Sequence, residues 1–188
     1  MSDTSYTDSA RSCIVGSVAW LHKEWLESYY PEDLPEDWRL SFYANDFNGL
    51  LLKSADIIPG LMGDNFQDEV SDDFRIFVLQ NDMPIAEIIQ QSAVLSEHFG
   101  MILASDGQLY SALNQPLGQW RYSSAGLMDT NCLVLDNIDG KDLKYWRQQL
   151  ETLQPLENGQ RLIFCQHVKG DIELLNNIKM MTEMMGLA

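Results

Sequence analysis

Short apolar runs recur along the chain, and each is followed by a segment with a different spacing of apolar residues. The runs are continuous and rich in Val, Ile and Leu, which is typical of strands buried on both faces of a sheet. They occupy residues 13–20, 50–53, 74–80, 101–104, 132–135 and 161–166. We therefore predict six buried strands.

Between these runs, apolar residues return every three or four positions, which is the spacing of an amphipathic helix. The predicted helices cover residues 22–30, 34–47, 84–99, 142–153 and 171–185. Pro35, Glu36 and Asp37 are typical of the first turn of the second helix. Its aromatic segment 39–46 could also form a strand, because aromatic residues favour sheets, but we prefer the helix.

Alternation of buried strands and amphipathic helices predicts an α/β fold with a mainly parallel sheet and flanking helices. Residues 1–11 are expected to be a flexible leader and residues 12–188 a single α/β domain. Residues 58–73 are expected to form a loop, and 105–130 an irregular, aromatic-rich excursion. Because a complete eight-stranded barrel usually takes ~250 residues, we expect an incomplete TIM-barrel-like architecture.

The chain is strongly acidic, with a net charge of -16 over 188 residues, and most of its acids lie in the first half. No basic footprint is visible, so direct nucleic acid binding is not expected. An acidic face could bind a basic protein partner or mimic nucleic acid, but solubility and charge self-repulsion are the more common reason for such charge. No membrane association is expected, because no apolar run reaches the length of a membrane span and the N-terminus lacks the order of a signal peptide. The expected location is cytoplasmic.

The sequence contains no motif that identifies a reaction. It lacks the glycine-rich phosphate-binding patterns and the serine hydrolase pattern, so no cofactor is expected. Its three cysteines, Cys13, Cys132 and Cys165, lie in apolar runs and are expected to be buried and reduced. Four methionines near the C-terminus are expected to form a helix face, with a homodimer contact as the alternative.

Candidate site residues lie where the predicted strands end, because parallel α/β folds place their sites at the carboxyl ends of strands. The candidate catalytic residues are Asp82, Asp106, Asp136 and His167. The candidate ligand-binding residues are Trp20, His22, Lys53 and Asp56. Convergent carboxylates and a histidine could hold a divalent metal or act as general acid and base. Asp and Asn at such positions also cap helices and shape turns, which is the more common role.

The segment 16–52 resembles the start of the YecE-like family, also called domain of unknown function 72. The resemblance rests on a series of short motifs. They are a Gly-x-x-x-Trp motif, a second Trp, an aromatic-Tyr-Pro motif, a Leu-Pro turn, a Tyr-Ala pair and a Phe before the second strand. Here these are Gly16 to Trp20, Trp25, Tyr29-Tyr30-Pro31, Leu34-Pro35, Tyr43-Ala44 and Phe47. The strand predicted from Phe74 could match the family's third strand.

The resemblance implies a barrel-like α/β fold of unknown function. After its second strand the family has the polar motifs Glu-x-Asn and Thr-Phe-Tyr. The corresponding segment of this chain lacks both motifs and reads Leu51-Leu52-Lys53-Ser54-Ala55-Asp56. The sequence therefore favours a shortened, diverged relative. We expect a non-enzymatic acidic interaction protein with a decayed barrel-type site. The alternative is a small metal-dependent enzyme with its site at the carboxyl ends of the strands.

Overall fold

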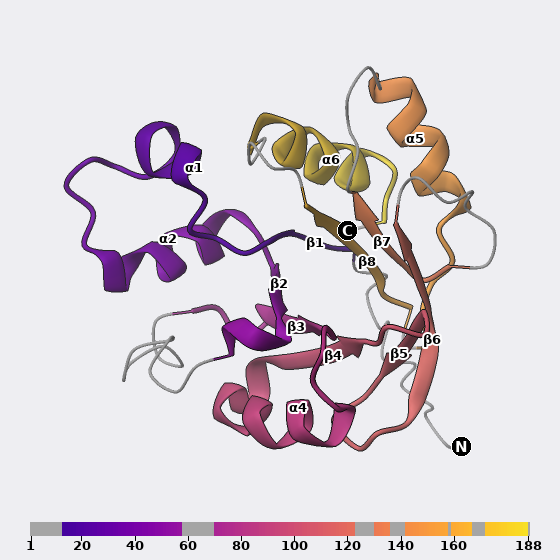
Figure 1. Ribbon diagram of the computed structural model, residues 1–188. Helices are drawn as coiled ribbons and strands as arrows, with labels where there is room; N and C mark the ends of the chain where they lie inside the picture. Colours follow the sequence, from indigo (N-terminus) through magenta and orange to yellow (C-terminus); the bar gives the residue numbers. More distant parts are fainter. Residues whose placement is uncertain are drawn as a thin grey trace, which may run out of the picture.

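The strands of the protein form a closed barrel in which neighbours in sequence are neighbours in space, and the last strand pairs with the first (Figure 1). The computed structural model describes residues 13–57, 70–122, 130–135, 142–157, 159–166 and 172–187. The strands are β1 (Cys13–Val18), β2 (Gly49–Lys53), β3 (Arg75–Leu79), β4 (Phe99–Leu103), β5 (Gln108–Tyr110), β6 (Pro116–Tyr122), β7 (Cys132–Leu135) and β8 (Arg161–Cys165).

The barrel is mostly parallel, and β5 is the exception. It pairs antiparallel with β4 on one side and with β6 on the other. All other neighbouring strands run parallel, from β1 through β4 and from β6 through β8 to β1. The carboxyl ends of all strands except β5 therefore lie at one end of the barrel.

The expected α/β barrel-like architecture is confirmed, but the expected incompleteness is not. The six predicted strands are present, and β5 and β6 complete the barrel from the segment 105–130 that was expected to be irregular. This prediction failed because β5 has only three residues and β6 contains a bulge and Gly118 at φ +153°. In addition, neither strand has the continuous apolar run by which the other strands were recognised in the sequence.

The helices follow the predicted order with shorter bounds. They are α1 (Lys23–Ser28), α2 (Arg39–Asp46), α4 (Ile85–Ser92), α5 (Leu143–Thr152) and α6 (Ile172–Met184). Short 3-10 turns cover Glu36–Trp38, Ser54–Asp56 and Ala93–His98. The aromatic segment 39–46 is a helix, as preferred, and the long helix predicted over 84–99 ends in a 3-10 turn. The expected leader and most of the expected loop 58–73 lie outside the described residues.

Large apolar side chains fill the inside of the barrel. Alternate residues of each strand point inward, since side chains alternate between the two faces of a strand. Phe77 of β3 and Phe164 of β8 meet with ring centroids 5.0 Å apart, and both are buried. Leu51, Leu103 and Trp120 belong to the same buried cluster. The barrel therefore has a packed core rather than a central pore.

A second apolar layer lies outside the barrel. Outward-facing strand residues such as Val15, Leu50 and Ile163 share one buried cluster with residues of α1, α2, α5 and α6. Trp25 of α1 and Trp146 of α5 are its largest fully buried members. A smaller cluster packs α4 against β3 and β4. Figure 1 shows α1 and α2 projecting to one side of the barrel.

Candidate functional site

The carboxyl ends of β2, β3 and β4 are joined by polar side chains. The Asn81 backbone N–H after β3 donates to Ser54 Oγ after β2 at 3.2 Å. Gln80 Oε1 accepts hydrogen bonds from the Ser105 N–H at 3.0 Å and from Ser105 Oγ at 3.2 Å. Gln80 Nε2 donates to the Met83 carbonyl oxygen at 2.9 Å. These bonds hold the ends of three neighbouring strands in fixed positions.

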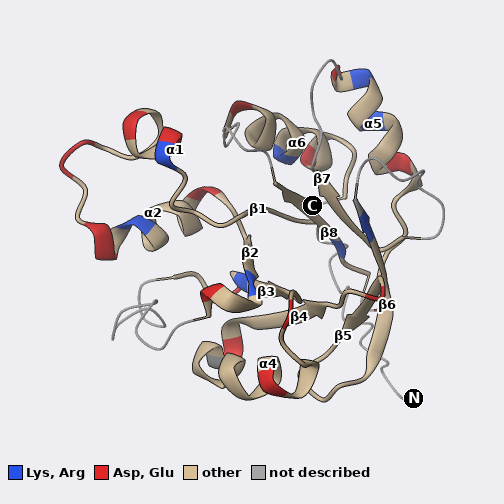
Figure 2. Ribbon diagram, viewed as in Figure 1, with Lys and Arg blue, Asp and Glu red and all other residues tan. Residues whose placement is uncertain are grey.

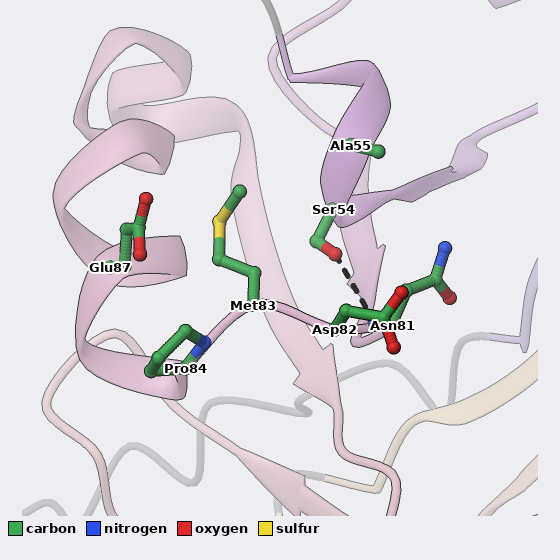
Figure 3. A pocket seen from close by; sticks show the side chains of 7 residues that line it. All are labelled: Ser54, Ala55, Asn81, Asp82, Met83, Pro84 and Glu87. Carbon is green, nitrogen blue, oxygen red and sulfur yellow. Dashed lines mark hydrogen bonds between the residues drawn. The ribbon is translucent and has the colours of Figure 1, made fainter.

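A pocket of about 310 Å³ lies beside this rim, between the 3-10 turn after β2 and the start of α4. It is lined by Ser54, Ala55, Asn81, Asp82, Met83, Pro84 and Glu87. Figure 3 shows the Met83 side chain rising between the helix that carries Glu87 and the turn that carries Ser54. The pocket therefore has an aliphatic middle and polar groups to either side.

Two carboxylates border this pocket from different elements. Asp82 lies in the exposed loop after β3, and Glu87 lies in the first turn of α4. An acid in the first turn of a helix interacts favourably with the helix dipole, which is a structural reason for Glu87. Ser54 is almost fully buried, with 1% of its surface exposed, so its hydroxyl belongs to the fixed wall of the pocket.

Asp106 has a turn-shaping role. Its Oδ1 accepts a hydrogen bond from the Gln108 N–H at 2.9 Å, and its Oδ2 accepts one from the Tyr110 hydroxyl at 3.2 Å. Gly107, at φ +82°, completes the turn between β4 and β5. The general expectation that such acids shape turns is met at this position. Its candidate catalytic role stays a prediction.

The first two candidate ligand-binding residues lie in the aromatic packing around α1. Trp20 is buried, and its carbonyl oxygen accepts a hydrogen bond from the Tyr30 hydroxyl at 2.7 Å. The His22 ring meets Trp25 edge-on at a centroid distance of 4.6 Å. Burial lowers the pKa of His22, while backbone hydrogen bonds at Val18 and Ala19 and the charge of Glu24 act in the opposite direction.

The other candidate residues are placed as follows. Lys53 ends β2 opposite Leu79 of β3, and Asp56 lies in the following 3-10 turn. Both side chains are exposed, and neither lines the pocket. Asp136 and His167 lie outside the described residues. Within the part of the chain that the structure describes, no three His, Cys, Asp or Glu residues are grouped so that they could hold a metal ion.

The three cysteines are buried, as expected. Burial raises the pKa of the Cys13 thiol to about 12, although the charge of Arg161 acts in the opposite direction. The pKa of Cys132 is also raised by burial. Because the thiolate is the reactive form of cysteine, the raised pKa of these two thiols disfavours nucleophilic chemistry there.

Two polar residues of the pocket, Ser54 and Glu87, were missed by sequence reasoning. Ser54 lies in the segment 51–56 at the end of β2, and sequence analysis gave it no role. Glu87 lies in the first turn of α4, the helix that follows β3, within a segment interpreted only as helix. Its position could have been recognised, because the first turn after a strand of a parallel barrel lies beside that strand's carboxyl end.

A second surface feature is the acidic arm, which we define as residues 23–46, comprising α1, α2 and their connection. Figure 2 shows acidic residues along this arm. Six of its acids are exposed: Glu24, Glu27, Glu32, Asp33, Glu36 and Asp37. Trp38 is also exposed, at 59% of its surface. The neighbouring aromatic residues, Trp25, Tyr30 and Tyr43, are instead buried in the core.

The acidic arm is fixed to the rest of the molecule. The Tyr29 hydroxyl donates to Asp46 Oδ2 at 2.7 Å, which joins α1 to the end of α2. Lys179 of α6 donates from Nζ to the Asp46 carbonyl oxygen. The ring of Trp25 stacks on that of Tyr43 with centroids 6.1 Å apart. The exposed acids are therefore presented on an ordered scaffold.

None of the described helices is long and apolar enough to cross a membrane. In comparisons with known proteins, no protein family, curated protein or solved structure matches this chain significantly.

Proposed function

We propose that this is a non-enzymatic interaction protein whose acidic arm binds a basic segment of a partner protein. The observation that carries the proposal is the exposure of Trp38 among acids of the arm. Within the described part of the chain, no lysine or arginine forms an ion pair with these acids. Exposed aromatic residues are enriched among the residues that dominate the energy of protein interfaces. Trp also binds cationic groups over its ring face.

The charge of the arm supports this proposal. Among the described residues, the one ion pair joins Arg147 and Glu151 of α5, and it includes none of the acids of the arm. Unpaired exposed acids of one sign produce a negative potential that attracts a positively charged partner. Such a field accelerates association more than it strengthens the final complex.

The proposal also accounts for the strand-end residues. Asp106 is engaged by the β4–β5 turn, Trp20 is buried in the core, and the partly buried His22 ring packs edge-on against Trp25. These placements favour structural roles for residues that an active barrel would use for chemistry. We retain the resemblance to the YecE-like family as part of the proposal, with the barrel-type site decayed and the protein placed in the cytoplasm.

A homodimer remains a subordinate proposal. Met180 and Met184 lie one turn apart on α6 and are 56% and 82% exposed, whereas Met181 and Met185 pack against the core. Exposed methionines adapt to partner surfaces because their side chains are flexible and polarizable. Light scattering of the wild type and of Met184→Glu would test this arrangement.

Isothermal titration with a synthetic peptide of alternating arginine and glycine tests the main proposal. We expect saturable binding that weakens steeply when the salt concentration rises from ~50 to ~500 mM, because salt screens exposed charges. Trp38→Ser should weaken binding at least ~10-fold, the effect of losing a central aromatic contact. It should leave the fold intact, since Trp38 is exposed.

A matched pair of charge variants provides the control. The arm variant combines Glu32→Gln, Asp33→Asn, Glu36→Gln and Asp37→Asn. The control variant combines Glu97→Gln, Glu157→Gln, Glu173→Gln and Glu183→Gln, four exposed acids outside the arm. Both variants remove the same charge. Equal loss of peptide binding in the two would show that net charge alone attracts the peptide and would overturn the proposal.

The metal-dependent enzyme is tested in the same protein. A thermal-shift series with Mg²⁺, Mn²⁺ and Zn²⁺ would reveal a metal site as a rise in melting temperature. A rise that disappears in Asp136→Ala and in His167→Ala would support the enzyme and contradict the decayed site.

A further inference from the structure

We propose that Arg39 of the acidic arm binds a carboxylate of the partner, so that the arm selects a basic segment that also carries an acidic side chain. This inference rests on the basic partner proposed above, and it adds the feature that distinguishes one basic segment from another. The observation that carries it is a guanidinium to which the described part of the chain offers no acceptor, although it lies among acids.

The Arg39 guanidinium has a buried part and an accessible part. Its Nε is shielded from solvent and has no hydrogen-bond partner among the described residues. The side chain as a whole is only partly buried, and within the described chain no atom accepts a hydrogen bond from its two terminal nitrogens, which therefore face solvent. The planar guanidinium is suited to bind a carboxylate through two parallel hydrogen bonds.

The shielded Nε has a free-energy cost, because it has lost its hydration without gaining an acceptor. Glu36 lies three residues before Arg39, at the spacing at which an acid and a base can meet on one helical turn. Among the described residues, however, no carboxylate forms an ion pair with Arg39. In native proteins a buried polar group without a partner often marks the place of a bound water, ion or ligand.

Arg39 lies on the side of the arm that packs against the barrel. Burial raises the pKa of the Tyr30 hydroxyl, and the charge of Arg39 acts on it in the opposite direction. That hydroxyl donates to the carbonyl oxygen of Trp20, just after β1. The guanidinium is therefore held beside a fixed part of the molecule, which reduces the entropy that it loses when it binds a partner.

The charges of the arm indicate which acceptor Arg39 can bind. A free anion such as phosphate would face the negative potential of the six exposed acids. A carboxylate within a basic segment avoids this repulsion, because those acids attract the arginines beside it. Trp38 directly precedes Arg39, so a segment that covers the Trp38 ring lies within reach of the guanidinium. Trp and Arg are also the residue types enriched among those that dominate interface energies.

The test is isothermal titration with two arginine–glycine peptides that differ only at one central residue, Glu in one and Gln in the other. Net charge alone predicts weaker binding of the Glu peptide, since it carries one positive charge fewer. We expect the opposite, with the Glu peptide binding about tenfold more tightly to the wild type through one Arg–carboxylate pair. Arg39→Gln should abolish this preference, and Arg39→Lys should retain only part of it, because lysine lacks the planar fork.

Lys23→Gln is the matched control, because Lys23 is the other cation of the arm and is exposed. It removes the same charge and should keep the wild-type preference. Arg39→Gln should unfold at the same urea concentration as the wild type, since Arg39 has no hydrogen bond or ion pair within the described chain.

The outcomes separate this inference from the function on which it rests. A preference for the Gln peptide, or a preference for the Glu peptide that persists in Arg39→Gln, would overturn the role of Arg39 and leave the basic partner standing. Binding of neither peptide would overturn the proposed function and this inference with it.

Discussion

The Tyr43 hydroxyl donates a hydrogen bond to the Gly49 carbonyl oxygen at 2.9 Å, at a point where both residues are buried. The same hydroxyl accepts a hydrogen bond from the Ser17 N–H at 2.8 Å. Tyr43 belongs to α2, Ser17 to β1 and Gly49 to β2, so one side chain links the acidic arm to the first two strands. Burial raises the pKa of this hydroxyl above its usual range.

Removing the hydroxyl should destabilise the protein without changing its shape. Tyr43→Phe leaves the buried Ser17 N–H and Gly49 carbonyl without this partner, so we expect a loss of about 1–3 kcal/mol in the free energy of unfolding. Urea denaturation followed by circular dichroism measures it. Tyr110→Phe is the matched control, because its hydroxyl bonds only the exposed Asp106. A smaller loss in Tyr43→Phe than in Tyr110→Phe would contradict this assignment.

Gly16 is required because β1 and β2 approach closely. A Cβ atom at residue 16 would lie 1.9 Å from the Gly49 carbonyl oxygen, and backbone atoms cannot move as a flexible side chain can. Gly16→Ala should therefore destabilise the protein by about 3 kcal/mol or leave it unfolded, at the upper end of overpacking costs.

The control for this prediction is Gly186→Ala, measured by the same denaturation experiment. Gly186 has φ +66° with open space around its Cβ position, so its cost should be only about 1 kcal/mol. Equal losses in the two variants would show that the β1–β2 approach leaves room for a methyl group.

His22 should titrate below the ordinary range of histidine. Burial opposes its protonation in the folded protein, whereas the unfolded chain binds the proton near pH ~6.5. Its contribution to stability is therefore present above pH ~6.5 and is lost as the pH falls through its lower folded-state pKa. NMR titration of the histidine ring signals, with His22→Gln to assign them, measures this pKa. A pKa of His22 at or above ~6.5 would show that burial does not control its protonation.

The sequence predicted the parts of the fold that depend on local pattern. Continuous apolar runs such as 132–135 identified strands, because both faces of those strands are buried. Closure of the barrel depends on β5 and β6, whose alternating and glycine-containing sequences lack such a run. The Asp106-Gly107 pair was the available signal, since this dipeptide is typical of hairpin turns.

The candidate site was predicted only in part, for a geometric reason. Strand ends are visible in sequence, so Asp82 was selected and it lines the pocket. Which strand-end residues share a cavity depends on the register between strands and on the helix that follows. Ser54 and Glu87 enter the pocket through those relationships, and neither carries a sequence motif. The exposure of Trp38 was not predicted, and it follows from the place of Trp38 in the 3-10 turn before α2.

The most direct test of the proposed function is a map of where a basic peptide binds. Backbone amide NMR signals of the protein would be followed during titration with the arginine–glycine peptide. We expect the largest shifts within residues 23–46, centred on Trp38, and we expect them to disappear in Trp38→Ser. Shifts spread evenly over all exposed acids, or centred on another surface, would contradict the proposed function.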